Sequence, residues 1–263
     1  MTSDTQPSGQ NGHSGNGAPR AKVCVYCGAN AGSSPLHLEA ARELGRAMAA
    51  NNIDLGLYHV PKRRLYSSTR IVLDNADMKT QNTVYGGGTV GLMGEVAKTL
   101  VSINGPDSVH GIIPEALVKY ERDGTYQTTN KSNQVVPEES VYGRTTVVKD
   151  MHTRKKLMAE EVFAGGPGSG FIGLSGGFGT MEEIFETTTW NQLGIHSNGI
   201  VLLNINGYWD GIVQWLDKAV EEGFVKEANK NILVTSTTPE GALQALRDYK
   251  VADGIYQLKW ESS

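Results

Sequence analysis

The feature that most constrains the fold of this chain is an alternation of two kinds of segment. From Ala21 onward, short apolar runs rich in β-formers alternate with longer stretches of helical periodicity. Apolar faces on both sides of the short runs are typical of a parallel sheet covered by helices. The alternation therefore predicts an α/β fold, a Rossmann-like three-layer α/β/α arrangement with a central parallel sheet. We expect strands at 22–27, 109–113, 144–148, 170–174 and 199–204, and helices at about 36–50, 91–102, 151–162, 180–193, 209–222 and 239–248.

Length and composition indicate one folded unit with a tail at each end. The 263 residues, 39% of them hydrophobic, suffice for one substantial core. Residues 1–20 are mostly Ser, Gly, Asn, Gln and Thr, which offer almost nothing to bury, so we expect a disordered tail. We expect a single domain at 21–250 and a C-terminal tail at 251–263.

The charge balance excludes some classes of partner. A formal charge of -4 and a pI near 5.9 provide no basic field for binding duplex DNA or an anionic membrane. There is no apolar run of about 18 residues, and the first 20 residues lack the apolar core of a signal peptide. We therefore expect a cytoplasmic protein with no nucleic-acid or membrane partner.

Cys24 and Cys27 form a C-x-x-C, which could indicate a redox pair or half of a zinc site. A structural zinc site needs about four ligands, and no second Cys or His pair is spaced to supply them. The surrounding residues read as a buried strand. We therefore interpret both cysteines as small strand residues and predict no metal.

Residues 56–83 do not fit the alternation. The strand expected after the first helix begins at 53–55 and resumes at Val84 and Tyr85, before a glycine cluster. The 28 residues between carry a Lys-Arg-Arg run at 62–64 and no clear amphipathic period. We interpret them as an insertion, either from a retained intron or alternative gene model or as a disordered loop. The alternative is a functional lid or basic arm.

Three glycine-rich loops follow predicted strands, where ligands bind in doubly wound sheets. The first, 27–33, is weak evidence because turns need glycine anyway. In the second, 85–94, and the third, 174–183, glycines let the backbone approach an anion and present amide hydrogens at a helix start. No Gly-Lys-Ser/Thr follows the glycines, so this is not a P-loop.

Glu183 has two interpretations. Thr180 and Glu183 have the spacing of a capping box, in which Glu183 would only satisfy backbone donors. A fourth segment, 150–156, favours a site instead. It places Arg154 and Lys155 near a helix start, where the positive end of the dipole disfavours bases unless an anion is bound.

Together these segments resemble the LONELY GUY cytokinin-activating enzymes, over nearly all of 22–249. The resemblance rests on their order: Gly86-Gly87-Gly88-x-x-Gly91-Leu92-Met93-Gly94, Met151-His152-x-Arg154-Lys155, Gly176-Gly177-x-Gly179-Thr180-x-Glu182-Glu183 and Thr189-Trp190-Asn191-Gln192-Leu193-Gly194-Ile195-His196. It implies a phosphoribohydrolase that releases the free base and ribose 5-phosphate from N6-modified adenosine 5'-monophosphates, and also from AMP. Relatives were long labelled lysine decarboxylases.

The resemblance also implies roles for individual residues. Glu183 is the catalytic carboxylate and Arg154 its partner, Glu182 lies nearby, and neither a metal nor an organic cofactor is required. A small-molecule nucleotide is the expected partner, and a homodimer or higher homo-oligomer the expected assembly. We interpret His152 and His196 as structural. The expected substrate-binding residues are Gly86, Gly87, Gly88, Met151, Lys155, Gly176, Gly177, Gly179 and Thr180.

The chain departs from the family pattern in three places. Ser175 replaces the usual proline before Gly176, which loosens the turn because proline would fix φ. A glycine-rich surplus at 165–170 is expected to lengthen a helix-to-strand loop. The segment 56–83 lies directly upstream of the second glycine loop.

Three other functions stay open at this point. A non-catalytic nucleotide-binding module would use the same glycine loops. A pyridoxal-phosphate decarboxylase would need a lysine imine. An NAD oxidoreductase is the least favoured alternative, because the first loop lacks G-x-G-x-x-G.

Deletion of residues 56–83 is expected to raise both the melting temperature and the phosphoribohydrolase activity. A direct join of Leu55 to Val84 avoids the entropy cost of closing a long flexible loop. Thermal unfolding and product release by the two proteins check this. A deletion variant that is unfolded or inactive would mean that the segment is an integral element.

Overall fold

A computed structural model of the chain describes residues 19–51, 83–118, 127–130, 134–256 and 258. The expected tail, up to residue 18, lies outside these ranges. So does the expected insertion, except for Thr83.

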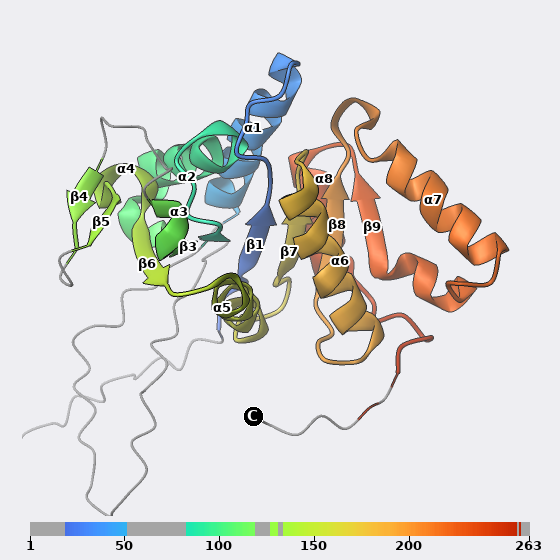
Figure 1. Ribbon diagram of the computed structural model, residues 1–263. Helices are drawn as coiled ribbons and strands as arrows, with labels where there is room; N and C mark the ends of the chain where they lie inside the picture. Colours follow the sequence, from blue (N-terminus) through green and yellow to red (C-terminus); the bar gives the residue numbers. More distant parts are fainter. Residues whose placement is uncertain (1–18, 52–82, 119–126, 131–133, 257, 259–263) are drawn as a thin grey trace, which may run out of the picture.

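The central sheet contains seven strands, all parallel, and this confirms the predicted fold class (Figure 1). Their order is β6-β3-β2-β1-β7-β8-β9, so the first strand lies in the middle. Their bounds are β1 Val23–Tyr26, β2 Thr83–Tyr85, β3 Val109–Pro114, β6 Arg144–Val148, β7 Gly170–Gly173, β8 Gly199–Leu203 and β9 Leu233–Ser236.

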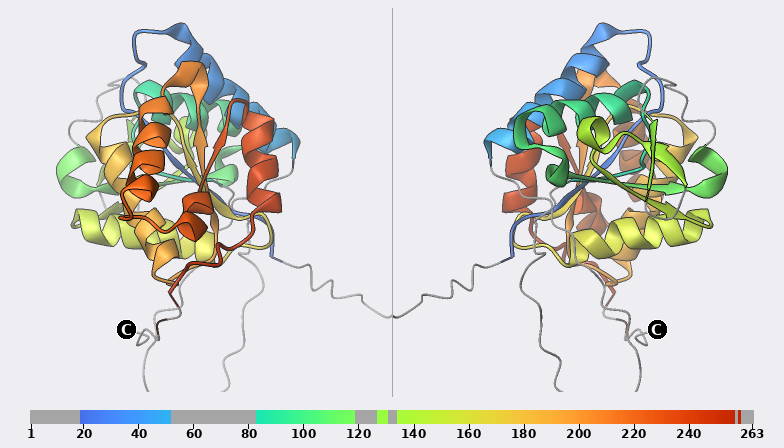
Figure 2. Two further views of the ribbon diagram at one scale, coloured as in Figure 1. Left: turned by 90° about the vertical axis from the view of Figure 1, so that its right-hand side faces the viewer. Right: turned by 90° about the vertical axis from the view of Figure 1, so that its left-hand side faces the viewer.

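Helices cover the sheet on both faces, as the edge-on views in Figure 2 show. One layer consists of α1 (Pro35–Ala50), α2 (Gly91–Asn104) and α8 (Pro239–Asp248). On the other face lie α5 (Met151–Phe163) and α6 (Phe178–Gln192), with α7 (Asp210–Glu221) beside the β9 end. Short elements complete the described residues: η1 (Pro106–Ser108), α3 (Glu115–Val118), the antiparallel pair β4 (Gln127–Thr129) and β5 (Val135–Pro137), α4 (Glu139–Tyr142), η2 (Ile205–Gly207) and η3 (Glu227–Ile232).

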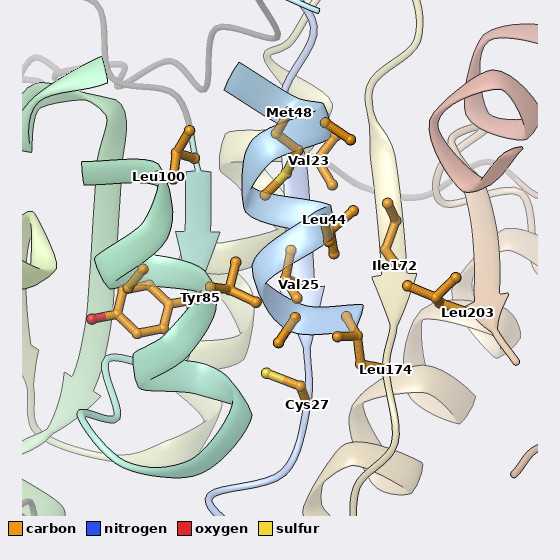
Figure 3. Packing of buried hydrophobic residues seen from close by; sticks show 14 of the residues in the cluster. Val23, Val25, Cys27, Leu44, Met48, Tyr85, Leu100, Ile172, Leu174 and Leu203 are labelled. Atoms are coloured by element: carbon orange, nitrogen blue, oxygen red, sulfur yellow. The ribbon is translucent and has the colours of Figure 1, made fainter. Parts of the chain in front are cut away.

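Successive residues of β1 supply the two halves of the core. Val23 and Val25 pack against the layer of α1, α2 and α8, whereas Cys24 and Tyr26 pack against the layer of α5 and α6. In Figure 3, Leu44 of α1 lies over the first of these faces. Full burial of a valine or leucine side chain contributes about 1.5–3 kcal/mol. The central strand β1 is therefore buried between the two helical layers.

The predicted helices agree with the structure to within about two residues, and each predicted strand is present. Prediction missed β9 and the pair β4–β5. Strand β2 consists of Thr83–Tyr85 and so includes Val84 and Tyr85, where the interrupted strand was expected to resume. Among the described residues, no helix is both long enough and apolar enough to span a membrane.

Hydrogen bonds join the loops that follow β1, β2 and β7. The amide of Leu92, at the start of α2, donates to the carbonyl oxygen of Gly28 at 3.0 Å. The Gly28 amide in turn donates to the backbone carbonyl oxygen of Ser175 at 3.0 Å. Gly91 makes the first contact possible. Its φ is +61°, and a Cβ there would overlap the backbone of Ala29.

Replacing Gly91 by alanine is expected to destabilise the protein through both strain and overlap. Positive φ alone costs an alanine about 1–2 kcal/mol, and the overlap adds roughly 1–3 kcal/mol. Gly223→Ala after α7 is the matched control, because its φ is +78° but a Cβ there would meet open space. Thermal unfolding should show a larger loss for Gly91→Ala, and equal losses would contradict the close approach of the loops.

Candidate functional site

The site lies where the chain changes direction across the sheet. From β1 the chain proceeds through β2, β3 and β6 on one side, and later through β7, β8 and β9 on the other. The β1 loop leads into α1 on one face, and the β7 loop leads into α6 on the opposite face. These loops diverge, and a crevice opens outside the carboxyl ends of β1 and β7, as expected for a doubly wound sheet.

A cavity of about 660 Å³ occupies this crevice. This is the size range of small-molecule sites. Eight of the predicted site residues line it: Gly86, Met151, Arg154, Gly176, Gly177, Gly179, Thr180 and Glu183. Three others, Gly87, Gly88 and Lys155, are not among its lining residues.

Arg154 and Glu183 form a buried ion pair in the wall of the cavity. Arg154 is on α5 and Glu183 on α6, and each is only 7% exposed. The Arg154 Nη1 donates to Glu183 Oε1 at 2.5 Å, and its Nε donates to the carbonyl oxygen of Ile112 at 3.1 Å. Gly86 leaves the space for this arrangement, because a Cβ there would overlap the guanidinium.

Burial raises the pKa of Glu183 above its ordinary value, although the charge of Arg154 opposes that rise. Removal from water disfavours the charged carboxylate, whereas the neighbouring cation favours it. Glu183 is therefore a carboxylate poised to change protonation state at a higher pH than an exposed one. A perturbed pKa in a cavity is typical of catalytic groups.

The capping interpretation of Glu183 is wrong. Helix α6 begins at Phe178, two residues before the predicted start, with Gly177 at its N-cap position. Thr180 therefore lies inside the first turn and makes no capping bond, while Glu183 bonds to Arg154. The error arose because the sequence spacing fitted a capping box but did not fix where the helix begins.

The start of α6 presents backbone amides to the cavity. No side chain caps this helix. A Cβ atom added to Gly177 or to Gly179 would meet open space. The first amides of a helix lack intrahelical acceptors and carry the positive end of its dipole. This end of α6 can thus accept an anionic group from a ligand.

Lys155 does not line the cavity itself, but it is ion-paired with Glu182, which does. Its Nζ donates to Glu182 Oε1 and, at 3.0 Å, to Glu186 Oε1. Burial lowers the pKa of Lys155, but the hydrogen bonds to these two carboxylates outweigh that effect and raise it overall. The expected contact of Lys155 with substrate stays a prediction.

Prediction overlooked several side chains that the structure brings to the cavity, among them three that are hydrogen-bonded near the β7 turn. His37 comes from α1, and Tyr208 comes from the segment after η2. Ser175 was noted only as a departure from the family pattern, although its Oγ is hydrogen-bonded to His37. The first glycine loop, at 27–33, also lines the cavity, although it was weak evidence by itself.

The cysteines and two further histidines considered from the sequence differ in their positions relative to the cavity. Cys24 and Cys27 are free and buried; Cys24 belongs to strand β1, and Cys27 follows it and lines the cavity. His196 lies outside the cavity with Nε2 2.9 Å from the carbonyl oxygen of Thr187, and burial lowers its pKa to about 4. His152 is exposed at the start of α5. Within the described ranges, no group of three or more His, Cys, Asp or Glu residues could hold a metal.

Comparison with known proteins gives the following similarities. The family described as "possible lysine decarboxylase" matches residues 93–246. A bifunctional cytokinin biosynthesis protein of Fusarium pseudograminearum is 46% identical over 238 residues, which are 90% of this chain but only 42% of that protein. A probable cytokinin riboside 5'-monophosphate phosphoribohydrolase of Oryza sativa subsp. japonica is 35% identical, with 91% of this chain and 78% of that one covered.

Two further similarities extend this set. A cytokinin riboside 5'-monophosphate phosphoribohydrolase of Arabidopsis thaliana is also 35% identical, over 87% of this chain and 83% of that one. Among solved structures, the molybdenum cofactor carrier protein of Chlamydomonas reinhardtii has a TM-score of 0.51 at 14% identity, with 87% of this chain and 96% of that one covered. At this identity the likeness concerns the fold alone.

Proposed function

The chain belongs to the LONELY GUY family of the "possible lysine decarboxylase" group, and from this membership we propose that it hydrolyses the N-glycosidic bond of cytokinin riboside 5'-monophosphates. The products are the free cytokinin base and ribose 5-phosphate. The buried Arg154–Glu183 pair in the cavity wall is the observation that carries the proposal.

Cleavage of the bond between C1' and N9 places positive charge on the ribose and negative charge on the departing base. Water supplies a hydroxyl group to C1', and a proton ends on the base. The Glu183 carboxylate stabilises the oxocarbenium-like sugar and orients or deprotonates the water. Arg154 fixes the direction of that carboxylate through its own bonds to Glu183 and the Ile112 carbonyl.

The 5'-phosphate occupies the start of α6 in this proposal. The amides of Gly177 and Gly179 and the Thr180 hydroxyl lie at that end of the cavity. Apolar side chains that line the cavity offer a surface for the base and its N6 substituent: Leu92, Met93, Ile113, Leu117 and Met151. The phosphate and the base then lie on different walls, with the reacting bond near Glu183.

A pyridoxal-phosphate decarboxylase fits the cavity poorly. Such an enzyme requires a lysine that forms an imine with the cofactor. Among the residues that the structure describes, no lysine lines the cavity, and Lys155 is bound by Glu182 and Glu186. A non-catalytic nucleotide-binding module would have no need for a buried carboxylate with a raised pKa. Homo-oligomerisation, a cytoplasmic location and the treatment of 21–250 as one functional unit belong to the same proposal. The first rests on the family resemblance, and the other two rest on the sequence.

The purified protein is expected to release base and ribose 5-phosphate from AMP and N6-isopentenyl-AMP, and to leave the corresponding nucleosides largely intact. The phosphate anchors the substrate at the start of α6, and a nucleoside lacks that anchor. Chromatography of the products separates these cases. Equal turnover of nucleotide and nucleoside would remove the phosphate anchor from the proposal.

Glu183→Gln is expected to lower kcat by at least about a hundredfold, because loss of a group that stabilises developing charge commonly costs that much. The melting temperature should also fall, because glutamine keeps the size and a hydrogen-bonding oxygen but leaves the buried charge of Arg154 without an anionic partner. The two proteins are therefore compared at a temperature at which both are folded. Glu186→Gln is the matched control: it lies on the same helix and is also ion-paired, but outside the cavity.

The pH dependence provides a second readout of the same substitution. Burial raises the pKa of Glu183 above 4.5, and the ionised form is the active one, so kcat should fall as the pH drops through that raised pKa. This acid limb should disappear in Glu183→Gln. A variant with near-normal kcat, or with the same acid limb, would rule out the carboxylate as the catalytic group.

A further inference from the structure

The turn after β7 is held by a side chain from a distant helix. Ser175 is only 6% exposed, and its Oγ is hydrogen-bonded to His37 Nδ1 at 2.9 Å. These residues are 138 positions apart in the sequence, on the β7 loop and on α1. The bond therefore ties the layer that contains α1 to the turn that leads into α6.

Tyr208 supports the same turn from a third segment. Its hydroxyl donates to the carbonyl oxygen of Gly176, and its ring meets the His37 ring edge to face, with 5.6 Å between centroids. His37 also lies close to Gly32, because its Cδ2 is 3.1 Å from the place that a Cβ on Gly32 would occupy. Two points of the turn, Ser175 Oγ and the carbonyl oxygen of Gly176, are thus hydrogen-bonded. The side chains that bond to them, His37 and Tyr208, also contact each other.

The turn needs such support in this chain because of what Ser175 replaces. Proline at this position, which is usual in the enzymes that the sequence resembles, fixes φ through its ring. Serine leaves φ free, and the two glycines that follow are the most permissive residues available. A mobile turn would have to be ordered when a phosphate binds, and that ordering costs affinity.

We propose that His37 is a positioning residue: through Ser175 it holds the Gly176–Gly177 turn in the geometry that binds the 5'-phosphate, and so takes the place of the proline ring. The inference rests on the proposed function for the identity of the ligand. Tyr208 assists by fixing the His37 ring and the Gly176 peptide.

A double-mutant cycle tests this, with binding of ribose 5-phosphate measured by calorimetry. His37→Phe removes the ring nitrogens but retains an aromatic ring against Tyr208. It is expected to raise the Kd by about 3- to 10-fold, as loss of one hydrogen bond commonly does, with little change in melting temperature. His37→Asn retains a polar atom near the place of Nδ1 and should restore most of the affinity.

The second arm of the cycle uses Ser175→Pro, which supplies the ring constraint directly. In this background His37→Phe should change the Kd by less than about twofold, because the histidine no longer sets the turn. If Ser175→Pro misfolds, Ser175→Ala replaces it, and His37→Phe should add nothing to the loss that Ser175→Ala causes. Glu43→Ala, on the exposed side of α1, is the control for substitution in that helix.

An equal effect of His37→Phe in both backgrounds would overturn the proposal, since His37 would then act independently of Ser175. No effect in either background, or no binding of ribose 5-phosphate by the unsubstituted protein, would also overturn it. Release of base from AMP is measured separately on the unsubstituted protein. Failure of that assay with an intact cycle would reject the proposed function and leave the positioning role standing.

Discussion

The structure depends on one topological constraint: the chain begins in the middle of an all-parallel sheet. Helices on opposite faces must then follow β1 and β7, so their loops turn away from each other at the carboxyl edge. A space remains between the loops that neither helical layer fills. The hydrogen bonds of Gly28 to Ser175 and of Leu92 to Gly28 keep this space from widening further. The cavity is thus a consequence of strand order, and the side chains that line it decide what it can do.

Burial of Arg154 and Glu183 in that cavity cannot be explained by stability alone. Taking two opposite charges out of water costs several kcal/mol per ion, and well-packed apolar residues often stabilise a protein as well or better. The surrounding structure nevertheless accommodates the pair, because Gly86 provides the space and the Ile112 carbonyl accepts from the guanidinium. A costly arrangement at the carboxyl edge of a doubly wound sheet is better explained by chemistry than by folding.

Helical and strand periodicity predicted the sheet and both helical layers because each element has an apolar face of the right period. The edge strand β9 escaped prediction, since its residues are only partly buried and show no continuous apolar run. For the site, the glycine loops and the order of Arg154 and Glu183 were readable. The sequence showed that Gly86 belongs to a glycine loop. It could not show why glycine is needed there, because the space that Gly86 leaves is occupied by Arg154, 68 positions away in the sequence. His37 and Tyr208 carried no local signal at all, because their relevance comes from a turn that lies far away in the sequence.

Burial and the charge of Arg154 have opposite effects on the pKa of Glu183. Together they explain how one carboxylate can both stabilise the cationic sugar and accept a proton from water in the proposed reaction. Burial disfavours the ionised form of Glu183, so its carboxylate takes up a proton from water more readily than an exposed carboxylate does. The guanidinium of Arg154 limits that effect, so the carboxylate can still face a cationic sugar in its ionised form. Without Arg154 the buried charge would have no compensating partner and would be lost by protonation. The two side chains are therefore one functional unit, and the effect of changing either cannot be assigned to that residue alone.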